Sequence, residues 1–96
     1  MSDWVEGPVL RVIDGDTFDM RVEWVGKLNR ERYNNAERIR LAGVNAPELN
    51  TPGGQEAKRR LEKQLNGRCV HCDVQARDCF HRLVCNVEVV PCRQAG

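Results

Sequence analysis

Residues 9–24 read VLRVIDGDTFDMRVEW and contain two strand-like runs on either side of a turn. Every second residue from Phe18 to Trp24 is apolar, and the residues between them are charged, which is the period of a strand with one buried face. Asp14-Gly15 lies between the two runs, and this dipeptide is a strong signal for a tight turn. The stretch therefore predicts two antiparallel strands that share one side of a core.

Further strands and one helix are predicted on the C-terminal side of this hairpin. Alternating apolar residues at 38–44, 69–76 and 82–90 predict three strands. Residues 55–66 instead carry apolar residues at every fourth position and stop at Gly67, as an amphipathic helix does. The polar residues 26–35 are expected to form a surface loop. The predicted buried stripe of the helix is Ala57, Leu61 and Leu65.

This element order is strand, strand, strand, helix, strand, strand. Short strands with one inserted helix suit a small closed β-barrel, because closure leaves no sheet edge exposed. The chain has 96 residues, which is enough for one domain and too few for two. We therefore expect residues 1–96 to form a single barrel domain.

The composition is that of an ordinary globular protein, with 41% hydrophobic and 30% charged residues. The net charge of +1 neither requires nor excludes a polyanionic partner. No apolar run is long enough for a membrane helix, and residues 1–10 lack the features of a secretory signal. These features predict a cytoplasmic protein without a membrane partner, in which the five cysteines are reduced.

Four short motifs carry the side chains that could perform chemistry. The turn at 14–17 combines two carboxylates with a hydroxyl, which are oxygen ligands suited to a hard cation, although Asp-Gly-Asp is also a common turn sequence. Pro47 stiffens the segment that holds Glu48. Arg40 lies on the outward face of the third predicted strand, and Arg82 begins the fifth. Arginine suits phosphate binding, although each of these residues alone could simply be a surface side chain.

Read together, these motifs resemble the staphylococcal-nuclease-like (thermonuclease) family. The strings VIDGDTF, RIRLAGVNAPE, GGQEAKRRLEKQLNG and RDCFHRLVCNVEV occur in this order, and the resemblance covers about residues 9–90. It implies a five-stranded OB-fold, order β-β-β-α-β-β, and a nuclease that hydrolyses phosphodiester bonds of single-stranded DNA or RNA with a bound calcium ion, Ca²⁺.

The resemblance also implies roles for individual residues. Glu48 stands at the place of the general base, which takes a proton from the attacking water. Arg40 and Arg82 stand at the places of two arginines that contact the phosphate and act in catalysis, and Phe80 lies at a substrate-binding position. The implied calcium site consists of Asp16, Asn45, the backbone of Ala46, and Thr17, which is adjacent and acts through water.

Three departures from the family pattern have consequences. Asn45 stands where a second calcium-binding aspartate is usual, so one formal charge is lost. Cys79-Phe80 replaces a Lys-Tyr pair, which removes a positive charge and a phenol hydroxyl. Only residues 90–96 follow the fifth strand, where the family continues with helices. A chain truncated there would leave an apolar patch uncovered, which predicts a homodimer through that surface.

The cysteines and histidines between residues 69 and 92 resemble zinc-ligand spacing. Cys69 and Cys72 have opposite parity, however, so a regular strand would point them to opposite faces. Cys72 and Cys85 fall on the inward faces of their strands, where a thiol acts as a small core residue. These positions favour core packing over a structural zinc site.

Two readings compete with the nuclease. The first is a non-catalytic OB-fold module that binds nucleic acid or a protein, and the second is a structural domain excised from a longer protein. The chain has only five aromatic residues, a poor supply for a base-stacking platform. A pure binding module has no use for a fixed general base, so the joint presence of Asp16, Arg40, Glu48 and Arg82 favours catalysis.

Overall fold

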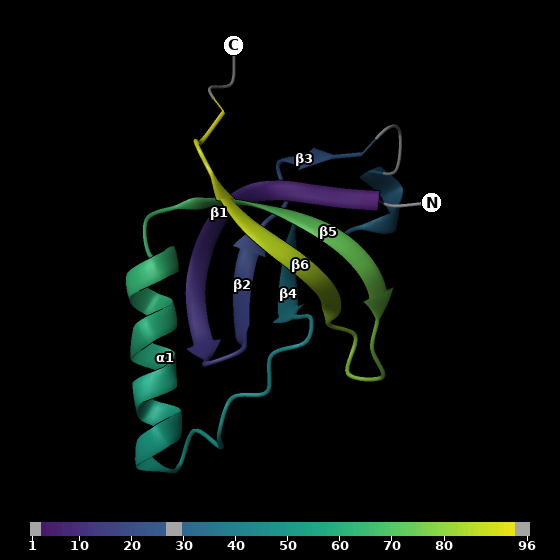
Figure 1. Cartoon of the computed structure of the whole chain (residues 1–96). Helices are drawn as coiled ribbons and strands as arrows, with labels where there is room; N and C mark the ends of the chain where they lie inside the picture. The colour runs from purple at the N-terminus through teal and green to yellow at the C-terminus, as the bar shows by residue number, and fades with distance from the viewer. Residues whose placement is uncertain (1–2, 27–29, 94–96) are drawn as a thin grey trace.

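The computed structural model describes residues 3–26 and 30–93. Parts of the predicted loop 26–35 and of the segment after the last strand therefore lie outside the described residues. The elements, shown in Figure 1, are β1 (Asp3–Asp14), β2 (Thr17–Arg21), β3 (Trp24–Val25), a 3-10 helix η1 (Arg30–Arg32), β4 (Ala36–Leu41), α1 (Pro52–Leu65), β5 (Cys69–Arg77) and β6 (Leu83–Val90).

Five of the strands close into a barrel. β1 pairs with both β2 and β5, β2 pairs with β4, and β5 pairs with β6, all antiparallel. β4 and β6 pair in parallel and complete the ring. α1 connects β4 to β5 and stands beside the end of β1 (Figure 1). The prediction of a five-stranded OB-fold barrel with one inserted helix is confirmed.

The structure corrects the N-terminal part of the predicted sheet. β1 begins at Asp3, well before the predicted start at residue 9, and a short strand β3 pairs with it. Trp24 lies on β3 and is 36% exposed, whereas alternation placed it in the core. The chain leaves β2 at Arg21 and crosses back to β1, where Glu23 N–H donates to Glu6 O at 3.0 Å. Gly7 permits this crossing, since a Cβ there would lie 2.0 Å from Arg21 O.

The predicted bounds of β4 and α1 also shift. β4 ends at Leu41 because the chain turns at Gly43, whose φ of 73° is left-handed. α1 begins at Pro52, three residues before the predicted start, because Thr51 caps it. The Thr51 hydroxyl accepts the Gly54 N–H at 3.1 Å, which satisfies one of the free donors of the first turn.

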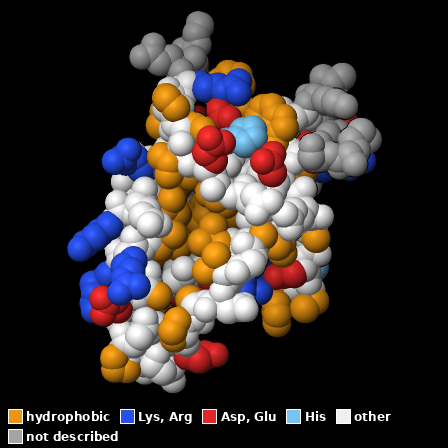
Figure 2. Space-filling view, in the orientation of Figure 1, with side chains coloured by type: hydrophobic (Ala, Val, Ile, Leu, Met, Phe, Trp, Pro, Cys, Tyr) orange, Lys and Arg blue, Asp and Glu red, His pale blue; other side chains and the backbone are white. Residues whose placement is uncertain are grey.

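The core fills the barrel and extends under α1. Leu61 and Leu65 are buried, as predicted, and Ala57 is only partly buried. Ala57 instead packs closely against the backbone of Gly15. A Cβ at position 15 would lie 2.6 Å from the Cβ of Ala57 and 2.7 Å from the Cβ of Ala46, so this contact requires glycine. The outer face of α1 carries lysine and arginine side chains (Figure 2). The largest buried barrel side chains are Phe18, Met20, Ile39, Leu83, Val5, Val22 and Val70.

One pair of cysteines is oxidised in this structure. Cys69 at the start of β5 forms a disulfide with Cys92, just beyond β6. The expectation that all five thiols are reduced is therefore wrong for this pair. Cys72 and Cys85 are buried in the core, as their strand positions predicted, and Cys79 is a free, exposed thiol. Disulfides persist mainly in oxidising compartments, so the cytoplasmic location stays a prediction.

The disulfide is expected to contribute about 3 kcal/mol to the free energy of unfolding. It joins residues separated by 23 positions, and a crosslink over such a loop lowers the entropy of the unfolded chain. Urea unfolding of Cys92→Ser should show this loss, whereas Cys79→Ser, which removes a free exposed thiol, should unfold like the wild type. Coincident curves for the wild type and Cys92→Ser would show that the crosslink is energetically neutral.

Among the described residues, no helix is both long enough and apolar enough to cross a membrane. The predicted homodimer, like the predicted single domain over residues 1–96, stays a prediction.

Candidate active site

Five of the eight predicted site residues converge on one cleft of about 240 Å³ at the end of the barrel. Its walls come from the β1–β2 turn, the end of β4 with the segment that follows it, and the residue before β6. Residues that are far apart in sequence thus face one space. The lining residues are Asp14, Asp16, Arg40, Ala46, Pro47, Glu48, Leu49 and Arg82.

The β1–β2 turn fixes the carboxylate of Asp16. The backbone N–H of Asp16 donates to Asp14 Oδ1 at 3.0 Å, and this hydrogen bond closes the turn. The Thr17 hydroxyl donates to Asp16 Oδ1 at 2.9 Å, and Thr17 itself is buried behind the cleft. The other oxygen, Oδ2, accepts the Ala46 N–H at 3.1 Å, so Asp16 is held from both the turn and the segment after β4.

The neighbouring carboxylates of Asp14 and Asp16 have opposite pKa shifts. Burial raises the pKa of Asp14, and the adjacent Asp16 raises it further. Burial also acts to raise the pKa of Asp16, but hydrogen bonds from Asp14, Ala46 and Thr17 outweigh it and the net pKa is lowered. Two carboxylates this close oppose each other's ionisation, and a bound cation would relieve that repulsion.

Arg40 joins the cleft to the turn that follows β4. Its guanidinium lies 3.5 Å from Asp16 Oδ2 and donates to Asn45 Oδ1 at 2.9 Å. It also donates to the carbonyl oxygens of Leu41, at 2.6 Å, and Val44. Arg40 therefore supports the 41–45 backbone in addition to facing the cleft.

Glu48 has a fixed backbone and a free side chain. Its carbonyl oxygen accepts hydrogen bonds from the Thr51 backbone N–H at 3.0 Å and the Thr51 hydroxyl at 2.6 Å. A Cβ at Gly54 would lie 1.9 Å from the same oxygen, so the first turn of α1 packs directly on Glu48. The Glu48 carboxylate is exposed and makes no hydrogen bond or ion pair within residues 3–26 and 30–93.

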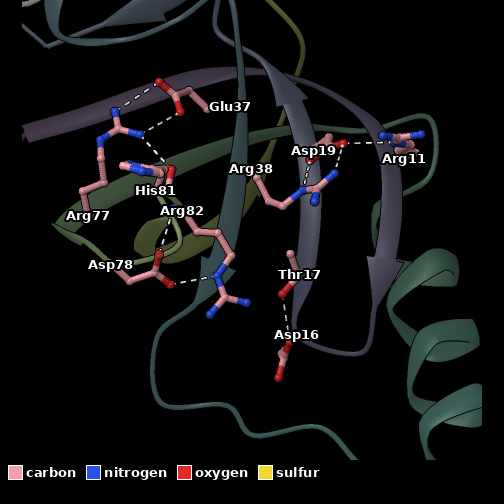
Figure 3. Close-up of polar contacts among 10 residues, drawn as sticks. All are labelled: Arg11, Asp16, Thr17, Asp19, Glu37, Arg38, Arg77, Asp78, His81 and Arg82. Atoms are coloured by element: carbon pink, nitrogen blue, oxygen red, sulfur yellow. Dashed lines mark hydrogen bonds and ion pairs between the residues drawn. The ribbon is translucent and has the colours of Figure 1, made fainter. Parts of the chain in front are cut away.

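Asp78 positions Arg82, and the sequence analysis did not identify it. One Asp78 oxygen accepts Arg82 Nε at 2.7 Å, and the other accepts the backbone N–H groups of Arg82 at 2.8 Å and Phe80 at 3.0 Å. The two Nη groups of Arg82 point away from Asp78 (Figure 3). An aspartate four residues before an arginine, in a short connection between strands, was the signal that could have identified this pair.

Three predicted site residues do not line the cleft. Thr17 is buried behind Asp16, and Asn45 lies beside the cleft on Arg40. Phe80 is 73% exposed, stacks on the Arg82 guanidinium at 5.2 Å, and borders a separate hollow beside Arg38.

The oxygen ligands at the cleft fit a calcium ion by their chemistry, because Asp14 and Asp16 supply hard carboxylate oxygens. Ala46 directs its N–H toward Asp16, and Asn45 Oδ1 is engaged by Arg40. Within the part of the chain that the structure describes, no three acidic, histidine or cysteine side chains group as a metal site. Such an ion would therefore depend on water or substrate oxygens for much of its coordination.

Comparison with known proteins points to one family of nucleases. The family model described as "Staphylococcal nuclease homologue" matches residues 38–94. The chain is 35% identical over 99 residues to a probable endonuclease LCL3 of Arthroderma otae, covering 84% of this chain and 35% of the relative. It is 32% identical over 94 residues to endonuclease Htp3 of Saprolegnia parasitica, covering 86% and 44%. The chain thus spans less than half of the length of these relatives.

Proposed function

The chain belongs to the staphylococcal nuclease homologue family, and we propose that it hydrolyses phosphodiester bonds of single-stranded DNA or RNA with a bound calcium ion. The observation that supports this most is the convergence of Asp16, Arg40, Glu48 and Arg82 on one cleft. Relatives are named endonucleases, which agrees with the same chemistry.

In this proposal Glu48 is the general base. A water molecule between its carboxylate and the scissile phosphate would lose a proton to Glu48 as it attacks phosphorus. The Glu48 carboxylate makes no ion pair with a described residue, so its oxygens are available to the attacking water. The Thr51 cap fixes the backbone from which it extends, which limits the loss of orientation on substrate binding.

The two arginines stabilise the charge that grows on the phosphoryl oxygens. Arg82 is oriented through Nε by Asp78, so its Nη donors are available to phosphate. Arg40 also lines the cleft and would add positive charge beside the phosphate. Donors that are aligned before the reaction lower the barrier most, because they do not reorganise in the transition state.

Asp16 and Asp14 are the residues that would hold the calcium ion. When bound, the ion supplies positive charge beside the phosphoryl oxygen and offsets the repulsion between the two carboxylates.

Digestion of single-stranded DNA in calcium and in excess chelator tests the proposal. Cleavage in calcium and none in chelator is the expected result. Equal cleavage in both would refute the calcium requirement. Binding without cleavage in either would refute hydrolysis and favour the non-catalytic OB-fold module.

Asn45→Asp is expected to tighten calcium binding, on the order of tenfold, because ligand charge is a main determinant of calcium affinity. The same change adds a third carboxylate near Asp14 and Asp16, so the calcium-free protein should lose some stability. Calorimetric titration with calcium measures the change. Asn50→Asp, which adds the same charge at an exposed position outside the cleft lining, is the control. An unchanged dissociation constant in Asn45→Asp would mean that this side chain does not reach the ion.

A further inference from the structure

We propose a second contact site for the same nucleic-acid strand at the opposite end of the barrel, centred on Trp24, Arg21 and Arg93. This inference rests on the proposed function, because it concerns the strand whose scissile phosphate lies in the cleft. A hollow of about 530 Å³ lies here, more than twice the volume of the cleft. Its lining residues are Arg21, Val22, Glu23, Trp24, Arg30, Asn35 and Arg93.

The aromatic and cationic groups of this site are held in place by the fold. The Arg93 guanidinium lies 5.2 Å from the centre of the Trp24 ring and 5.6 Å from that of Trp4. Arg93 Nε also donates to Glu6 at 2.6 Å, and Glu6 is buried and contacts His71 at 2.9 Å. Basic, acidic and histidine side chains gather at the upper edge of the molecule (Figure 2).

The disulfide reinforces this arrangement, because Cys92 precedes Arg93 directly and ties it to the start of β5. The tryptophan and arginine are thus ordered before any ligand arrives, which lowers the entropic cost of binding.

The charge of the hollow suits an anion. Three arginines line it against one acidic lining residue, Glu23, and one of the three, Arg93, is also paired with the buried Glu6. Arg30 is engaged by Val22 O at 2.6 Å and by Asn35 at 3.2 Å, which leaves its charge in place but fixes its direction. Arg21 is exposed at the end of β2 and has no ion pair within the described part of the chain, so it is available to a phosphate.

A basic path on the outer face of β2 and β4 connects the cleft to this hollow. It starts at Arg40, opposite the buried Thr17, and continues along Asp19 and Arg38 to Arg21, which lies opposite Ala36. Arg38 and Arg11 both pair with Asp19, at 2.8 and 2.9 Å, so this middle row keeps a net positive charge (Figure 3).

The length of this path fits a short stretch of nucleic acid. Thr17 to Arg21 is four residues of strand, or roughly 13 Å. Even at the rise of about 3.4 Å per nucleotide of a stacked strand, four nucleotides cover that distance, and an extended strand needs fewer.

The chemistry selects a single strand as the occupant. An exposed indole beside cations is the combination that binds an unpaired base and its phosphate, and the base must be unstacked to reach the ring. We therefore assign this site to a nucleotide about two to four positions from the scissile bond.

Binding of a labelled oligothymidylate of 12 nucleotides, measured by fluorescence anisotropy in chelator, tests the second site without cleavage. Trp24→Ala should weaken binding of the 12-mer roughly five- to a hundredfold, since one base–aromatic stack is lost. Trp24→Phe, which keeps an aromatic ring, should retain most of the affinity. Arg21→Ala should weaken the 12-mer and reduce its salt dependence by about one phosphate contact. Lys63→Ala on the outer face of α1 is the control.

Wild-type affinity for the 12-mer in both Trp24→Ala and Arg21→Ala would overturn this inference, whatever the nuclease assay shows. Heparin carries charge without bases, so an equal loss of heparin binding in Trp24→Ala would overturn the stacking role. If the protein cleaves nothing in calcium but Trp24→Ala still loses the 12-mer, the second site is supported while the proposed hydrolysis fails. Thermal melts of each variant identify losses that arise from unfolding, and Arg21→Ala remains informative because its side chain is exposed.

Discussion

Glu48→Gln is expected to slow phosphodiester cleavage by about 10²–10⁴-fold, the usual contribution of a general base. The amide keeps the shape of the side chain but does not accept a proton at neutral pH. Because the Glu48 side chain has no described partner and its backbone is held by Thr51, the fold should be unaffected. Single-turnover rates at saturating calcium measure the loss directly.

Glu56→Gln is the matched control for this change, since Glu56 is exposed on α1 near the same end of the barrel and lies outside the cleft lining. It should cleave at the wild-type rate. A Glu48→Gln protein that also matches the wild-type rate would remove Glu48 from the mechanism.

Arg82→Ala is expected to reduce the cleavage rate on the order of 10²–10³-fold with little change in melting temperature, because one aligned transition-state donor is lost. Its ion pair with Asp78 is partly exposed, so it adds little to stability. Arg82→Lys should not restore the rate, since lysine has no fork that can bond Asp78 and phosphate together. Arg82 is a cleaner target than Arg40, whose loss would also free the 41–45 backbone.

Arg77 provides the contrast on the same hairpin. It pairs with Glu37 at 3.0 Å, and Glu37 is buried, so Arg77→Ala leaves a buried carboxylate without its cation and should lower the melting temperature. Its activity per folded molecule should stay near the wild type. If Arg82→Ala instead lowers the melting temperature and keeps the rate where it is folded, Arg82 is a structural residue.

The sequence predicted the elements whose signals are local. Alternation located β5 and β6 to within a residue or two, because each strand has one face in the core. It misplaced Trp24 because β2 stops at Arg21 and the chain crosses at Gly7, a contact between distant segments. The disulfide also escaped prediction, since Cys92 follows the last strand and its distance from Cys69 depends on the β5–β6 pairing.

The residues of the candidate site also separate into those whose positions follow from local sequence and those whose positions depend on contacts between distant segments. Asp16 and Thr17 share a turn, so their proximity followed from the residues alone. That Arg82 reaches the same cleft depends on the parallel β4–β6 pairing, which no local pattern encodes, and before the structure it rested on family resemblance. Asp78 was missed because an aspartate in a turn has many uses, and only its three contacts reveal its role.

The parallel pairing of β4 with β6 also constrains how the chain folds. The β1–β2 and β5–β6 hairpins are local in sequence and can form early, whereas bringing Ile39 beside Leu83 closes a long loop and is slow. Asp16 and Arg82 stand on opposite sides of that junction. The cleft therefore exists only once β4 and β6 have paired. A chain that has formed only its hairpins contains every residue of the site but has no site.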